Sequence, residues 1–570
     1  LQEWAEDTRL GIPVFAASDM EWGASHQFTE IGPEEGKPTP VPFPMGLGAT
    51  RNVEHAGTAG RITATEARAM GFTMNFAPVA DVNTNPNNPV IGVRSFGEQP
   101  GLVSDMVAAQ VSAFQENGVI AVAKHFPGHG DTAVDSHTGL PIVTYDRETL
   151  EDVHLAPFQA AIDAGVDSIM TAHVIIEAID PDLPATLSPK ILTDLLREEM
   201  GYNGVIITDS MGMAAISDKW GTEQAAVMAI KAGADLILSV SHKSYEGILE
   251  ALRSGELSEE RINESVKRVL TLKCKYGLFE DPYVDPDAAV QSVGTAENIR
   301  HTAEISRDSI TLVKNNGTLP LNPKQRDRTI LVTGQTSGAF RNVLPSLADT
   351  VQKMTDSSVI DMGWPVQRNP HDAEIEEVIR EAKNVDTVIV ATYSNSSLSE
   401  QQIKLVNKLI ETETSVVVIS LGLPYDLENF PEVDAYLASY ALNVNPMASI
   451  QSVKAAVEVV FGKLPVTIGD LYTYGHGLHY EPVKNSGDMK ELVEQFEKAG
   501  EIKSDSAARS LTLHLTAVNI YEEKGQADKV VKHMEGFQVL LDQQKENKWI
   551  SDRAYNTLKA DAENLIEKWQ

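Results

Sequence analysis

The chain lacks most features of disulfide-bonded, metal-binding and membrane-spanning proteins. Its 570 residues contain a single cysteine, Cys274, which excludes an internal disulfide and a thiolate metal cluster, and we expect this thiol to be buried. No apolar run approaches the length that spans a bilayer, so we expect no membrane span. Basic residues are few, with 47 Lys and Arg against 81 Asp and Glu. The net charge of −34 therefore disfavours nucleic acid and anionic membrane surfaces as partners.

The first half of the chain alternates short apolar runs with helical stretches. Each run ends in polar residues, as parallel strands covered on both faces should. The runs are PVFAASD (13–19), TMNFAPVAD (73–81), VIAVAKHF (119–126), SIMTAHV (168–174), VIITD (205–209) and LILSV (236–240). Active sites of (β/α) barrels lie at the carboxyl ends of such strands. The pattern predicts a barrel-type catalytic domain over residues 1–285.

A second α/β pattern follows the Gly- and Pro-containing stretch at 276–286. Its apolar runs are TILVTG (329–334), TVIVATY (387–393), SVVVISLG (415–422) and AYLASY (435–440). Because they alternate with helical segments, we expect a parallel α/β/α sandwich over residues 286–484. The Asn-Asn-Gly sequence at 315–317 is expected to be a plain loop.

Residues 488–570 are rich in lysine and glutamate and show helical periodicity. Three apolar faces are formed by Leu511, Leu515 and Val518, by Val530, Met534, Phe537 and Leu541, and by Tyr555, Leu558, Ala562, Leu565 and Trp569. Spacings of three and four residues predict a small three-helix bundle. Such a module could be a spacer, a packing domain or a ligand-binding domain.

The stretch AVAKHFPGHGDTAVDSHTGL at 121–140 places Lys124, His125, Asp135 and His137 at the end of one apolar run and in the loop after it. In an irregular segment, side chains two positions apart can point the same way, so Asp135 can hold the Nδ1 atom of His137. The other ring nitrogen is then free to exchange protons near neutral pH. A loop-capping aspartate beside an exposed histidine is the alternative reading.

This stretch resembles the signature loop of family 3 glycoside hydrolases of the β-N-acetylglucosaminidase branch. The resemblance continues in MNFAPVADVNTNPNNPVIGVRSFG (74–97), IMTAHV (169–174), VIITDSMGM (205–213) and YGHGLHY (474–480). It implies a barrel and a sandwich domain, an acid/base dyad of Asp135 and His137, and no metal or organic cofactor. The family normally has two further βα units before the first run, so we expect a barrel that lacks them, either as a fragment or as a reduced form.

Asp209 ends the run VIITD and should lie at the mouth of the barrel. The resemblance implies that this carboxylate is the nucleophile, with Met211 in the following loop where the sugar would lie. The alternative for a strand-terminal aspartate is a helix N-cap. Together, Asp209 and the dyad predict retention of configuration through a covalent glycosyl-enzyme.

The resemblance also implies a set of sugar-binding residues. They are Asp19, Arg94, Lys124, His125 and His173. For His173 a satisfied core histidine is nearly as good an interpretation. Asp81 is expected to brace the loop NTNPNNP rather than to touch substrate.

The chain departs from the family pattern after its first run. The family has D-Q-E-G-G with an arginine eight positions after the aspartate, whereas this chain has DMEWGASHQ. Trp22 therefore replaces a glycine, and Gln27 stands in place of the arginine. This change leaves the sugar preference open.

We expect an exo-acting enzyme that removes terminal β-linked N-acetylglucosamine from cell-wall or chitin-derived oligosaccharides, outside the cell or associated with its wall. One alternative is an N-acetylglucosaminide phosphorylase. Another is a non-catalytic saccharide-binding wall protein, although the presence of Asp135, His137 and Asp209 argues against it.

Overall fold

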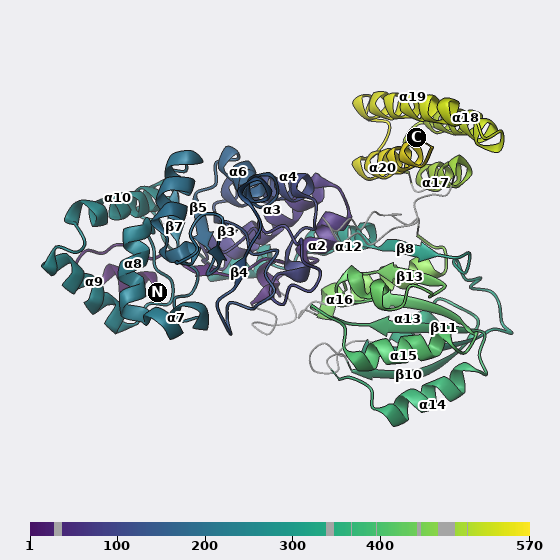
Figure 1. Ribbon diagram of the computed structural model, residues 1–570, viewed down its shortest axis with the longest axis horizontal. Helices are drawn as coiled ribbons and strands as arrows, with labels where there is room; N and C mark the ends of the chain where they lie inside the picture. Colours follow the sequence, from purple (N-terminus) through teal and green to yellow (C-terminus); the bar gives the residue numbers. More distant parts are fainter. Residues whose placement is uncertain are drawn as a thin grey trace.

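The computed structural model describes residues 1–27, 37–337, 347–365, 368–394, 396–441, 446–464, 485–498 and 500–569. They form a barrel-like α/β domain, an α/β/α sandwich and a helical bundle, which Figure 1 shows from purple through teal to yellow. The segment YGHGLHY lies outside the described residues. No described helix has the length and apolar character needed to cross a membrane.

The N-terminal domain is built on a parallel five-stranded sheet with the order β1-β2-β3-β5-β7. The strands are β1 (Ala17–Ser18), β2 (Met74–Asn75), β3 (Ile120–Phe126), β5 (Ser168–Thr171) and β7 (Val205–Ile207). The expected strand at 236–240 is reduced to a single bridge between Ile207 and Leu236. Among the described residues the sheet therefore stays open, with β1 as one edge strand.

Helices cover the outside of this sheet (Figure 1). The longer ones are α3 (Val53–Ala69), α4 (Pro100–Glu116), α6 (Ala156–Asp163), α8 (Thr222–Ala232), α9 (His242–Ser254) and α10 (Glu259–Lys275). The shorter ones are α1 (Gln2–Glu6), α2 (Pro44–Ala49), α5 (Arg147–Thr149), α7 (Ala214–Trp220) and α11 (Pro286–Ser292), with π-helices at Leu150–Leu155 and Lys190–Glu199. A small two-stranded sheet joins β4 (Ile142–Val143) to β6 (Ile175–Ile176).

The alternation of the strand residues explains why both faces of the sheet are apolar. Ala121, Ala123 and Ile169 belong to the large core shared with the helices, whereas Ile120, Val122 and Met170 pack in a separate cluster on the other face. Successive side chains of a strand point to opposite faces, so a continuous apolar run fills both cores.

The sandwich domain contains a six-stranded sheet with the order β10-β9-β11-β12-β13-β8. Its strands are β8 (Thr311–Asn315), β9 (Thr329–Ser337), β10 (Ser358–Pro365), β11 (Thr387–Thr392), β12 (Ser415–Ser420) and β13 (Ala435–Ala438). The sequence runs located β9, β11, β12 and β13 but not β8 and β10. Most pairs are parallel, but β8 is antiparallel to β13, so the sheet is mixed rather than purely parallel.

The helices of the sandwich are α12 (Ala296–Ser309), α13 (Leu347–Gln352), α14 (Asp372–Ala382), α15 (Glu400–Ile410) and α16 (Pro446–Val460). One apolar cluster of this domain continues into the N-terminal domain, where it includes Trp22, Phe43, Met45 and Val93. The two domains therefore share a core at their contact.

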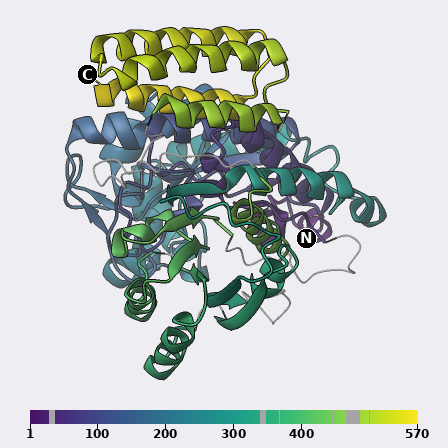
Figure 2. The same cartoon turned by 90° about the vertical axis from the view of Figure 1, so that its right-hand side faces the viewer.

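The described residues of the C-terminal module form four helices instead of the expected three. They are α17 (Ser486–Lys498), α18 (Asp505–Glu523), α19 (Ala527–Glu546) and α20 (Asp552–Trp569), and they run side by side in Figure 2. The predicted apolar faces meet in one core, to which α17 adds Met489, Leu492, Val493 and Phe496. The apolar residues of α17 show the same helical periodicity, but this helix was not among the predicted ones.

Cys274 is exposed, so the expectation of a buried thiol was wrong. It lies on α10, where Leu272 and Lys273 face inward. A helix turns by 100° per residue, so the next position points away from the core.

Candidate active site

The carboxyl ends of the barrel strands surround a cavity of about 620 Å³. The sequence-predicted residues that line it are Asp19, Arg94, Lys124, His125, His137 and Asp209. Segments more than a hundred residues apart in the sequence therefore meet in one place. Parallel strands produce this arrangement because their carboxyl ends lie on the same edge of the sheet.

Asp209 follows β7 and lines this cavity. Its Oδ1 atom accepts a hydrogen bond of 2.7 Å from the Ser210 N–H. Burial raises the pKa of the Asp209 carboxyl, but the charge of His125 and the Ser210 N–H outweigh it, so the pKa is lowered overall. Asp209 is therefore ionised at neutral pH, as a nucleophile must be.

Asp135 and His137 form the expected dyad. The His137 Nδ1 atom lies 2.7 Å from Asp135 Oδ1, and the same oxygen accepts the His137 backbone N–H at 2.8 Å. Although burial opposes ionisation, these contacts lower the pKa of Asp135. With Nδ1 held by a carboxylate, Nε2 is the ring nitrogen left for proton transfer.

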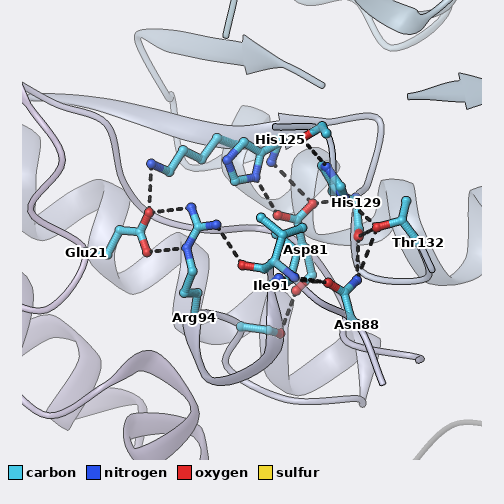
Figure 3. Close-up of polar contacts among 12 residues, drawn as sticks. Glu21, Asp81, Asn88, Ile91, Arg94, His125, His129 and Thr132 are labelled. Atoms are coloured by element: carbon cyan, nitrogen blue, oxygen red, sulfur yellow. Dashed lines mark hydrogen bonds and ion pairs between the residues drawn. The ribbon is translucent and has the colours of Figure 1, made fainter. Parts of the chain in front are cut away.

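Buried His129 anchors the loop that contains the dyad. Its Nδ1 atom is 2.7 Å from Thr132 Oγ1 and its Nε2 atom is 3.1 Å from Ser136 Oγ, between the two dyad residues. Burial lowers the pKa of His129 to about 4, so the ring is neutral. Asn88 Nδ2 donates to the His129 carbonyl at 2.9 Å (Figure 3).

Gly130 allows the dyad loop to pack closely on the segment after Asp81. A Cβ atom at position 130 would lie 1.7 Å from the Val82 carbonyl oxygen, which no side chain could tolerate. Asn85 then donates to the Thr132 carbonyl at 3.1 Å, so the NTNPNNP loop and the dyad loop support each other.

Asp81 orients His125 instead of bracing the NTNPNNP loop, which corrects the sequence-based expectation. Its Oδ2 atom lies 2.7 Å from His125 Nδ1, and its Oδ1 atom accepts the His129 N–H at 2.7 Å (Figure 3). Burial raises the pKa of Asp81, but His125 lowers it more. The His125 ring is thereby fixed at the cavity wall.

Glu21 joins Lys124 and Arg94, and sequence reasoning missed it. It accepts hydrogen bonds from Arg94 Nε at 2.8 Å and Arg94 Nη2 at 2.7 Å, and lies 2.8 Å from Lys124 Nζ (Figure 3). Lys124 also donates to Asp19 Oδ1 at 2.6 Å. Burial alone would raise the pKa of Glu21, but the two cations hold it well below its usual range. The segment DMEWG contains both Asp19 and Glu21, and nothing in it indicates that Glu21 balances two distant cations.

His173 and Met211 do not line the cavity, in contrast to their predicted substrate-binding roles. His173 is fully buried, with Nδ1 2.7 Å from Thr186 Oγ1 and Nε2 3.0 Å from the Ser210 carbonyl. Both ring nitrogens of His173 therefore have hydrogen-bond partners, which agrees with the alternative interpretation that His173 is a core residue. Through its contact with the Ser210 carbonyl, it supports the residue after Asp209. Met211 packs in the main core, and Met213 faces the cavity in its place.

Within the described ranges, no group of three or more His, Cys, Asp and Glu side chains could hold a metal ion.

The chain is similar to known glycosidases over most of its length. It is 32% identical over 532 residues to a protein named Beta-hexosaminidase A from Pseudoalteromonas piscicida, which covers 82% of this chain and 85% of that one. The chain belongs to glycosyl hydrolase family 3. Residues 1–272 match the family's N-terminal domain, residues 310–506 its C-terminal domain, and residues 486–567 a FIMAH domain.

Two further proteins are similar to this chain. Beta-hexosaminidase LpqI of Mycobacterium tuberculosis is 36% identical over 272 residues, covering 46% of this chain and 68% of that one. The solved structure of a family 3 beta-N-acetylglucosaminidase from Paenibacillus sp. has a TM-score of 0.68 and 37% identity, covering 80% of this chain and 85% of that one. This protein is a glycoside hydrolase that acts on β-linked sugars.

Proposed function

We propose that the enzyme is a retaining exo-β-N-acetylglucosaminidase. The observation that carries the proposal is the presence in one cavity of an ionised Asp209 and of His137 paired to Asp135 at 2.7 Å. A nucleophilic carboxylate and a separate proton donor are the two groups that retaining hydrolysis needs. The beta-hexosaminidase names of the relatives support the choice of sugar.

In the first step, the Asp209 carboxylate attacks the anomeric carbon of the terminal sugar. The bond to the glycosidic oxygen breaks, and that oxygen takes the proton from Nε2 of protonated His137. The products are a glycosyl ester on Asp209 and a free alcohol. The pKa of Asp135 is lowered, so its side chain is an ionised carboxylate. This negative charge stabilises the imidazolium of His137 before the proton is transferred.

In the second step, neutral His137 removes a proton from water, whose oxygen attacks the anomeric carbon. The ester bond breaks, Asp209 returns to its carboxylate form, and the sugar leaves with its original configuration. Two inversions at one carbon give net retention. Because His137 is neutral at this stage, it repels an anionic acceptor less than a carboxylate base would.

The test is hydrolysis of p-nitrophenyl N-acetyl-β-glucosaminide beside the corresponding β-glucoside, with the anomeric configuration of the first product followed by NMR. We expect preference for the N-acetyl sugar and a β-configured product. A faster β-glucoside would overturn the sugar assignment, and an α-configured product would overturn retention. The same assay with phosphate present distinguishes the phosphorylase alternative, which would yield a sugar 1-phosphate.

The natural substrates that we propose are cell-wall or chitin-derived oligosaccharides ending in β-linked N-acetylglucosamine, met outside the cell or at its wall. Chitobiose, a muropeptide and a glycolipid bearing this terminal sugar form the decisive panel. Turnover of the glycolipid alone would overturn the proposed substrate class.

A further inference from the structure

Trp22 and His26 form a ring pair at the edge of the catalytic cavity. Both residues line the cavity that also contains Asp19 and Asp209. Their ring centroids are 3.5 Å apart and their planes differ by 25°. A short turn at Ala24–His26, closed by the His26 N–H to the Gly23 carbonyl at 3.0 Å, brings the imidazole back over the indole.

The backbone before this turn admits only glycine. Gly23 has a φ of +89°, and a Cβ atom there would lie 2.9 Å from the Thr39 carbonyl oxygen. Positive φ and close packing together restrict the position to glycine. The path from Trp22 to His26 is therefore firmly set.

Trp22 is held in place by the apolar cluster that the two domains share. Only 8% of the residue is exposed, and its ring meets Phe43 edge-on at 4.7 Å in the apolar cluster that continues into the sandwich domain. The indole thus supports the imidazole from the shared core of two domains. His26 is the more exposed partner and lines the cavity.

The polar groups around His26 leave its ring free. Asp19, Glu21, Lys124 and Arg94 are near enough to act on it electrostatically, but Glu21, Lys124 and Arg94 are occupied with one another. Within the part of the chain that the structure describes, His26 Nδ1 and Trp22 Nε1 are buried and have no hydrogen-bond partner, so the His26 ring meets the cavity through its other edge. Burial lowers the pKa of His26 to about 4, so the ring is a neutral hydrogen-bonding group at working pH.

We propose that His26, held on Trp22, is a specificity-determining residue that binds a hydroxyl of the terminal sugar beside Asp19, away from the bond that breaks. This inference rests on the proposed function and deepens it. A neutral ring at this position selects a terminal sugar with a free, uncharged hydroxyl group. A sugar substituted or missing at that hydroxyl loses the contact.

The test compares the p-nitrophenyl N-acetyl-β-glucosaminide with its 4-deoxy and 6-deoxy analogues in wild type, His26→Ala and His26→Asn. We expect His26→Ala to lower kcat/KM for the parent by about threefold to tenfold, mainly through KM, as for loss of one neutral hydrogen bond. For the analogue that lacks the contacted hydroxyl, the loss should be within about twofold. His26→Asn, which retains a polar group, should recover part of the activity on the parent.

Trp22→Phe and Trp22→Ala test the support of the ring. Trp22→Phe keeps a smaller aromatic face and should show part of the selectivity change, whereas Trp22→Ala should reproduce the full change of His26→Ala. His242→Ala, on the exposed side of α9, is the matched histidine control and should change nothing. An equal loss on all three substrates in His26→Ala would overturn the proposal, as would no loss at all.

The wild-type enzyme alone shows whether the proposed function is wrong, so this outcome is distinguished from failure of the His26 contact. If wild type prefers β-glucosides, the same comparison is made with the glucoside and its deoxy analogues. If wild type turns over neither, calorimetric binding of free N-acetylglucosamine and its deoxy forms replaces kinetics. A selective loss of binding in His26→Ala would support the contact, and an unselective one would overturn it.

Discussion

The N-terminal and sandwich domains both place a carboxylate near the carboxyl ends of parallel strands, yet the two groups differ in charge state. Burial alone would raise the pKa of the Asp209 carboxyl, but the electrostatic interaction with His125 lowers it overall. Asp426 in the sandwich is buried and accepts hydrogen bonds from the hydroxyls of Thr392, Ser394 and Ser420, and burial raises its pKa to about 6. A similar place in a sheet therefore supports catalysis only where charged partners keep the carboxylate ionised.

Replacing these two carboxylates is the strongest test of the comparison. Asp209→Ala should lower kcat by roughly 10⁴-fold or more, because the covalent path disappears. Asp426→Asn should leave kcat near wild type. Kinetics on the p-nitrophenyl glycoside measure both variants, and circular dichroism checks their folds. More than a few per cent residual activity in Asp209→Ala would contradict its role.

The dyad should show a dependence on the leaving group. His137→Ala should slow hydrolysis of unactivated glycosides by roughly 10²- to 10⁴-fold, the usual contribution of general acid catalysis. A dinitrophenyl leaving group needs no proton, so its glycosylation step should be largely restored. Asp135→Asn should show part of the same defect by releasing the ring.

If His137→Ala slows activated and unactivated substrates equally, then His137 binds substrate or supports the structure, and the acid lies elsewhere. Single-turnover kinetics with both substrates separate the two results.

Breaking the buried charge cluster should destabilise the protein. Glu21→Gln leaves Lys124, whose side chain is 2% exposed, without its buried partner, and should reduce the free energy of unfolding by about 3–5 kcal/mol. The control is Glu151→Gln, which breaks an exposed pair with Arg147 and should cost less than about 1 kcal/mol. Urea unfolding of both variants measures the difference, and equal losses would refute it.

Asp426 should make the stability of the sandwich depend on pH. Its pKa in the folded state, about 6, exceeds the unfolded value of 3.8, so the folded state binds the proton more tightly. The stabilisation is fully present below pH 3.8 and is lost as pH rises through 6, with a total of about 3 kcal/mol. Asp426→Asn should flatten this slope in urea unfolding between pH 4 and 7. An unchanged slope would contradict the assignment.

Strand prediction was most reliable for long apolar runs. The runs at 119–126, 387–393 and 415–422 correspond to β3, β11 and β12, whose residues are almost entirely buried. β10 was not predicted because it is an edge strand whose residues are mostly exposed or only partly buried. The run at 236–240 was predicted to be a strand but does not form one. Val240 is 51% exposed, and the run makes one isolated bridge, from Leu236 to Ile207.

The sequence alone determined the chemistry that depends on close spacing and on position within a strand. Asp135 and His137 are two residues apart, so their contact is local, and Asp209 follows an apolar run that leads to the cavity. Only the tertiary structure decided which distant groups neutralise one another. Glu21 meets Arg94 and Lys124, Asp81 meets His125, and His173 turns inward to Ser210. The reason is physical: charge and hydrogen-bond partners act through space over a few ångströms, and folding sets those distances.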